Sequence, residues 1–124
     1  MNLNQITVPS KDVPKAIEFY KKLGLELIVH THDRYARFEC TVGDTTFSIH
    51  YREYIPKGEG VLIYFEVKDM DETISELTKK GIKFNRMLEE KSWLWKEARL
   101  KDPDGNQIII YHAGENRKNP PWRI

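Results

Sequence analysis

The chain has 124 residues, a size typical of one domain, and its 40% apolar and 31% charged residues are too apolar for a disordered protein. A net charge of +1 gives no support to a nucleic-acid partner, and the single cysteine, Cys40, excludes an intramolecular disulfide or a cysteine-based zinc cluster. No apolar run approaches the length of a membrane span, and the first residues lack a signal-peptide pattern. We therefore expect a cytoplasmic protein without nucleic-acid or membrane partners.

Two segments of the sequence repeat each other, and each has the pattern of a short amphipathic helix. KDVPKAIEFYKKLG at 11–24 and KDMDETISELTKKG at 68–81 are identical at five of their 14 positions. In both, an aspartate precedes apolar residues spaced three and four apart, and a glycine follows the last turn. Asp12 and Asp69 are therefore predicted N-caps, and Gly24 and Gly81 are predicted left-handed residues at the helix ends.

Alternation of polar and apolar residues predicts strands around each helix. We expect them at 5–8, 25–29, 35–42 and 45–51 in the first half, and at 62–67, 82–86, 93–100 and 107–112 in the second. Turn residues separate the strands, most clearly in the sequence DPDGN at 102–106. Each half is thus predicted to be a βαβββ module.

The predicted domain organisation is a single domain over 1–124 with α+β architecture. Module one spans about 2–52, a linker about 53–60 and module two about 61–113, and an extended tail at 114–124 is pinned to the surface by Trp122. Neither half has enough apolar residues for a core of its own, so we expect both to pack together. The expected result is a curved, partly open antiparallel or mixed sheet with both helices on its convex face.

The two faces of the predicted sheet differ in chemistry. One parity is apolar and is expected to face the helices: Ile6, Val8, Ala36, Phe38, Cys40, Val42, Phe47, Ile49, Ile63, Phe65, Ala98, Leu100, Ile108 and Ile110. The other mixes aromatic and charged residues, which is typical of a concave small-molecule site. We expect ligand-binding residues there: Gln5, Thr7, Tyr35, Arg37, Glu39, Ser48, His50, Tyr64, Glu66, Trp93, Trp95, Glu97 and Tyr111. A dimer interface would use the same rings, and a plain solvated face is the third reading.

The paired modules, the stretch KDVPKAIEFYKKLGL after the first strand, and the stretch WKEARLKDPDGNQIIIY resemble the vicinal oxygen chelate superfamily. That superfamily includes glyoxalases, ring-cleaving dioxygenases, epimerases, and bleomycin- and fosfomycin-resistance proteins. The resemblance covers nearly all of 2–113. It implies the fold, a homodimer, and four metal-binding positions, two in each module, which in this sequence are Gln5, Ser48, Leu62 and Ile109.

This chain departs from the superfamily pattern at the implied metal positions. Leu62 and Ile109 cannot coordinate a cation and Ser48 is a poor ligand, which leaves Gln5 alone. We therefore expect no metal and no other cofactor. A shifted site is the alternative, with His50 and carboxylates on the same face: Glu39, Glu66 and Glu97.

Two classes of function stay open from the sequence. The first is a bleomycin-resistance-like protein that binds a small aromatic or cationic molecule between aromatic rings and carboxylates. The second is an enzyme: a lactoylglutathione-lyase-like or dioxygenase-like protein with a shifted metal site, or a metal-free acid/base catalyst. For the catalyst the candidate residues are Glu97, Glu66 and His50.

Overall fold

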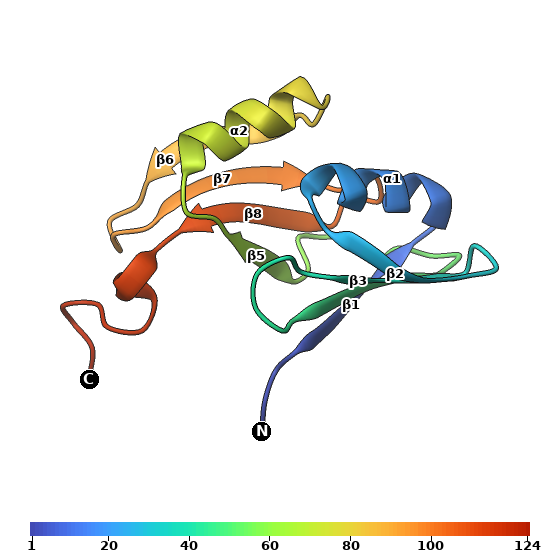
Figure 1. The fold of residues 1–124 in the computed structure, drawn as a ribbon, viewed down its shortest axis with the longest axis horizontal. Helices are drawn as coiled ribbons and strands as arrows, with labels where there is room; N and C mark the ends of the chain where they lie inside the picture. Colours follow the sequence, from blue (N-terminus) through green and yellow to red (C-terminus); the bar gives the residue numbers. More distant parts are fainter. The chain divides into compact units, whose positions relative to one another are not determined.

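The computed structural model describes all residues 1–124 and repeats one βαβββ module twice (Figure 1). The first module contains β1 (Gln5–Ser10), α1 (Val13–Leu23), β2 (Glu26–Thr31), β3 (Tyr35–Glu39) and β4 (Thr46–Tyr51). The second contains β5 (Leu62–Glu66), α2 (Met70–Lys79), β6 (Phe84–Glu90), β7 (Lys96–Lys101) and β8 (Gln107–His112), followed by the 3-10 helix η1 (Gly114–Arg117). This confirms the predicted α+β fold of two modules. Neither α-helix has the length and apolar character needed to cross a membrane.

Each module forms its own four-stranded mixed sheet. The strand orders are β1-β4-β3-β2 and β5-β8-β7-β6. In both sheets the first and last strands of the module pair in parallel and the other pairs are antiparallel. Since directly paired residues point to the same face, the register creates two rows. They are Thr7, Ser48 and Arg37 in the first sheet, and Glu66, Tyr111 and Glu97 in the second.

The chain divides into two compact units that differ from the modules by one hairpin. One unit contains 1–60 together with 102–106, and the other contains 61–101 together with 107–124. The hairpin at 102–106 joins β7 to β8 but bonds to the first module. There the Tyr20 hydroxyl donates to Asp102 Oδ2 at 2.6 Å, and the Asn106 amide donates to the Pro9 carbonyl at 3.0 Å. The DPDGN motif therefore attaches to helix α1 and strand β1. That the whole chain is one domain stays a prediction.

Both helices begin and end as the sequence predicts. The Asp12 carboxylate accepts a hydrogen bond from the Lys15 backbone N–H at 3.1 Å, and Asp69 accepts one from Glu72 at 3.0 Å. These bonds satisfy N–H groups that have no partner within the helix. Gly24 closes α1 in the left-handed region, with φ of 107°. Each helix lies over one face of the sheet of its own module (Figure 1).

The apolar parity faces the helices, as expected. Its buried members are Val8, Ala36, Phe38, Phe47, Ile49, Ile63, Ala98, Leu100, Ile108 and Ile110. In the first unit the Tyr20 ring of α1 packs on Phe47 at 4.6 Å and on Phe38 at 5.8 Å between ring centroids. Cys40 is half-buried, and burial raises the pKa of its thiol, which is consistent with an unreactive side chain.

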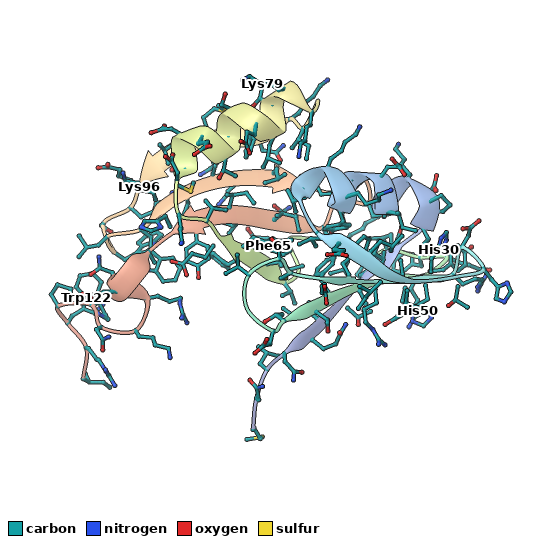
Figure 2. The ribbon with its side chains drawn as sticks, viewed as in Figure 1. His30, His50, Phe65, Lys79, Lys96 and Trp122 are labelled. Atoms are coloured by element: carbon teal, nitrogen blue, oxygen red, sulfur yellow. The ribbon has the colours of Figure 1, made fainter.

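Three expectations from the sequence are wrong in detail. Val42 was expected to face a helix but is 82% exposed, because β3 ends at Glu39 and a loop precedes β4. Strand β7 begins at Lys96 and not at 93, because a turn closed by the Leu94 N–H and the Lys91 carbonyl, 3.0 Å apart, occupies the preceding residues. The tail is not extended throughout, because 114–117 form η1. Trp122 is 54% exposed (Figure 2), and its role in pinning the tail stays a prediction.

Candidate functional site

The open face of the first sheet carries a continuous chain of polar side chains. Gln5 on β1 donates from Nε2 to Ser48 Oγ on β4 at 2.6 Å, and Ser48 Oγ lies 2.8 Å from the Tyr35 hydroxyl on β3. Arg37 donates from Nε to the same Tyr35 oxygen at 2.9 Å. Ser48 is fully buried, whereas Arg37 is exposed. Four residues predicted for ligand binding are therefore brought together here.

The other predicted residues of this face lie around that chain. Thr7 is 3.4 Å from Gln5 Nε2, and the His50 ring meets the Tyr35 ring edge-on at 6.0 Å between centroids. Figure 2 shows His50 on the side of the first sheet away from α1. Glu39 does not belong to this hydrogen-bonded series of side chains. It lies at the end of β3 and lines a hollow of about 410 Å³.

The open face of the second sheet is a packed aromatic cluster. The rings of Tyr64, Trp95 and Tyr111 lie 4.9–5.9 Å apart between centroids. Tyr111 is buried together with Ile109 and Ala113, and the partly buried Leu62 and Trp95 pack against these residues. Burial, and secondarily the charge of Glu66, raises the pKa of Tyr111. Tyr111 and Trp95 therefore belong to a second small core, and the more exposed Tyr64 ring contacts both of them.

Glu97 is the least accessible charged residue of this face, with an exposed fraction of 2%. It accepts a hydrogen bond from Trp93 Nε1 to Oε1 at 3.2 Å, while Oε2 is buried and has no hydrogen-bond partner. Trp93 reaches Glu97 from the turn before β7, and its ring is about half exposed. That turn holds Leu94 at a φ of 67°, which is rare for a bulky residue.

Unlike Glu97, Glu66 has partners for both of its carboxylate oxygens. Its Oε1 accepts hydrogen bonds from the backbone N–H groups of Ala113 at 3.1 Å and Gly114 at 3.0 Å. Its Oε2 lies 3.7 Å from Arg117 Nε. Both oxygens are engaged in holding the start of η1, which also explains why the tail turns there. Of the three candidate catalytic residues, Glu97 alone combines burial with an unpaired oxygen.

The residues at the implied metal positions do not fit a metal ion. Both ends of the Gln5 amide are engaged, Nε2 with Ser48 and Oε1 with the Thr46 hydroxyl. Leu62 and Ile109 offer only carbon atoms, and Ile109 is buried. No group of three or more histidine, cysteine, aspartate or glutamate side chains that could hold a metal ion is found. The shifted site with His50 and carboxylates stays an alternative from the sequence.

Comparison with known proteins assigns the family. The model of the Glyoxalase/Bleomycin resistance protein/Dioxygenase superfamily matches residues 2–110. The chain belongs to this superfamily. The uncharacterized protein YraH of Bacillus subtilis (strain 168) is 34% identical to this chain over an alignment of 127 residues. The alignment covers 90% of this chain and 98% of YraH.

Solved structures agree with this assignment at the level of the fold. A glyoxalase/bleomycin resistance protein/dioxygenase from Nocardioides matches with a TM-score of 0.80 and 18% identity, over 100% of this chain and 89% of that one. Lactoylglutathione lyase from Agrobacterium tumefaciens matches with a TM-score of 0.73 and 17% identity, over 90% of this chain and 92% of that one. At these identities the matches show a shared fold and carry no information about the reaction.

Sequence reasoning missed two residues that shape the site. The Thr46 hydroxyl donates to Oε1 of the Gln5 side chain, and Arg117 lies against Glu66. Thr46 has the same strand parity as Ser48, so the alternation that identified Ser48 also pointed to Thr46. Arg117 lies in the tail, where no strand periodicity could have marked it.

Proposed function

We propose that this superfamily member binds a small cationic aromatic molecule without a metal, and that Glu97 is its counter-ion. The observation that carries this proposal is the unpaired Oε2 of a carboxylate that is 2% exposed. A carboxylate removed from water is unstable unless donors meet its oxygens, and a bound ammonium, amidinium or N–H group would supply the missing donor.

The surroundings of Glu97 favour a flat, positively charged partner. Tyr111 pairs directly with Glu97 across β7 and β8, and Trp95 stacks on Tyr111 with an angle of 31° between ring planes. Aromatic faces attract cations and stack on planar ligands. The Trp93 ring already attracts one cation, since Lys91 Nζ lies 5.7 Å from its centroid.

Metal-free acid/base catalysis is the second candidate function. The same unpaired Oε2 would accept a proton from a bound substrate, a role that needs a carboxylate within hydrogen-bond reach of the reacting group. A metal-dependent lyase or dioxygenase reaction has no support from the donor set. Leu62 and Ile109 supply no ligand, and Gln5 is already bonded at both ends.

The test is a fluorescence titration with benzamidine, a planar aromatic cation that carries N–H donors. The background variant Trp122→Phe leaves Trp93 and Trp95 as the reporters, since the chain has three tryptophans. We expect saturable binding that Glu97→Gln weakens by at least about ten-fold, equivalent to about 1.4 kcal/mol. The exposed Glu90→Gln should bind like the background protein.

Neutral benzamide and the quaternary benzyltrimethylammonium ion separate the contributions of charge and of N–H donation. We expect benzamidine to bind most tightly, because it alone offers both a charge and a donor for Oε2. Equal affinity of the background protein and Glu97→Gln for benzamidine would refute Glu97 as the counter-ion. A thermal melt of Glu97→Gln at or above that of the background protein would show that the loss of binding is not unfolding.

A further inference from the structure

We propose that the open face of the first sheet carries a site for an oxyanion, either a carboxylate or a phosphate group. The Tyr35 hydroxyl and the Arg37 guanidinium are its donors. This site lies in the first unit and takes a negatively charged group, so it does not rest on the proposal for Glu97. The argument begins with the direction of the hydrogen bonds around Ser48.

The orientation of the Gln5 amide follows from its backbone neighbour. Gln5 Nε2 lies 3.1 Å from the Ile6 carbonyl oxygen, which can only accept a hydrogen bond. The nitrogen and not the oxygen of the amide must therefore stand there. The same nitrogen is 2.6 Å from Ser48 Oγ, so Ser48 accepts from Gln5. On its other side the Gln5 oxygen accepts from the Thr46 hydroxyl, which agrees with this orientation.

The direction continues from Ser48 to Tyr35. Ser48 is fully buried, so its hydroxyl hydrogen needs an acceptor within the protein. Its two side-chain partners are Gln5 Nε2, which donates, and the Tyr35 oxygen at 2.8 Å. Ser48 therefore donates to Tyr35. Arg37 Nε can only donate, and it donates to the same oxygen at 2.9 Å.

The Tyr35 oxygen thus accepts two hydrogen bonds, and its own hydrogen has no acceptor in the protein. That hydrogen is available to a bound group. The guanidinium of Arg37 keeps two further N–H₂ groups beside it, and the side chain is exposed. Glu39, two residues along β3, forms no ion pair with Arg37 that would neutralise it.

An oxyanion is the chemical group that this arrangement fits. A carboxylate or phosphate offers several acceptor oxygens and a negative charge, and arginine binds both groups with paired N–H donors. A cation would meet the positive guanidinium and a hydroxyl hydrogen. The exposed His50 ring lies beside Tyr35 on the same face.

The test follows the backbone amides of isotope-labelled protein by NMR during titration with sodium acetate or inorganic phosphate. The ionic strength is held at about 0.1 M, where interactions between exposed charges more than about 10 Å apart are screened. We expect saturable shifts confined to β1, β3 and β4. Arg37→Gln and Tyr35→Phe should each weaken binding about ten-fold, because each removes a charge-assisted hydrogen bond. The arm that binds more tightly identifies the preferred group as a carboxylate or a phosphate.

Arg34→Gln is the matched control, since Arg34 also lies against a tyrosine ring, 4.2 Å from the centroid of Tyr51. It should bind both anions like the wild type. The absence of saturable shifts with either anion would overturn the proposal, as would an equal loss of binding in Arg34→Gln. If Tyr35→Phe binds as well as the wild type while Arg37→Gln does not, the hydroxyl is not a donor and the assignment fails. The amide spectrum of each variant also shows whether it is folded.

Discussion

The hydrogen bond between Tyr20 and Asp102 makes a quantitative prediction for Tyr20→Phe. The Tyr20 hydroxyl donates to Asp102 Oδ2 at 2.6 Å, and both side chains are buried. Asp102 keeps three other donors, the backbone N–H groups of Asp104 and Asn106 and the Asn106 side chain. Loss of one bond to a charged acceptor should lower the free energy of unfolding by about 2 kcal/mol at neutral pH. Urea unfolding measures this change, and the melting temperature should fall by roughly 10 °C.

The pH dependence identifies the source of that loss. Burial raises the pKa of Asp102, so its contribution to stability is present below its ordinary value and is lost as the pH rises through the folded value. The Tyr20 hydroxyl opposes that rise, and Tyr20→Phe should raise the pKa of Asp102 further. The cost of the substitution should therefore shrink to about 1 kcal/mol near pH 3, where the bond joins neutral groups. An equal cost at both pH values would refute this reasoning, and the exposed Tyr54→Phe should cost nothing measurable.

Two further predictions rest on the structure, and a third, the homodimer, rests on the resemblance to the superfamily. Trp95→Ala should lower the free energy of unfolding by roughly 2–3 kcal/mol, because the Trp95 ring packs on Tyr111. Phe38→Ala in the main core should lower it by roughly 3–5 kcal/mol. If Trp95→Ala is as stable as the wild type in urea unfolding, the aromatic cluster is not packed as described. In an alkaline titration followed by ultraviolet absorbance, Tyr20 and Tyr111 should each ionise above the ordinary tyrosine pKa, because burial raises the pKa of both. Stability should fall as the pH rises above about 10. We expect a homodimer of twice 14.7 kDa by light scattering, and a mass near that of one chain would exclude it.

The fold was predictable because local signals and the repeated pattern agree. Asp12 and Gly24 mark the ends of α1, and strand alternation separates the buried face from the open one. Strand ends were less predictable, because they depend on contacts distant in sequence. The backbone N–H groups of Ala113 and Gly114 donate to the Glu66 carboxylate at the start of η1. No local pattern of 114–117 encodes these bonds.

The membership of the open face was predictable, but the state of each side chain was not. Alternation placed Glu66 and Glu97 on the same face, and it could not show that one is fully bonded and the other has an unpaired oxygen. That difference depends on which N–H groups the fold brings to each carboxylate. The attachment of DPDGN to Tyr20 was equally hidden, since 82 residues separate the partners.

The apolar residues at the implied metal positions have a structural consequence beyond the absence of ligands. Ile109 and Leu62 lie in the cluster that supports Tyr111 and Trp95, so these two positions contribute packed carbon where a metal site would need oxygen or nitrogen ligands. We predict that elemental analysis of the purified protein finds no stoichiometric divalent metal, and about one zinc, nickel, iron or manganese per chain after dialysis would overturn this. Ile109→Glu would bury an unpaired carboxylate in that cluster, so building a metal site here should cost stability before it gains affinity. The same cluster includes Trp95 and Tyr111, the rings on which the site proposed for a cation depends.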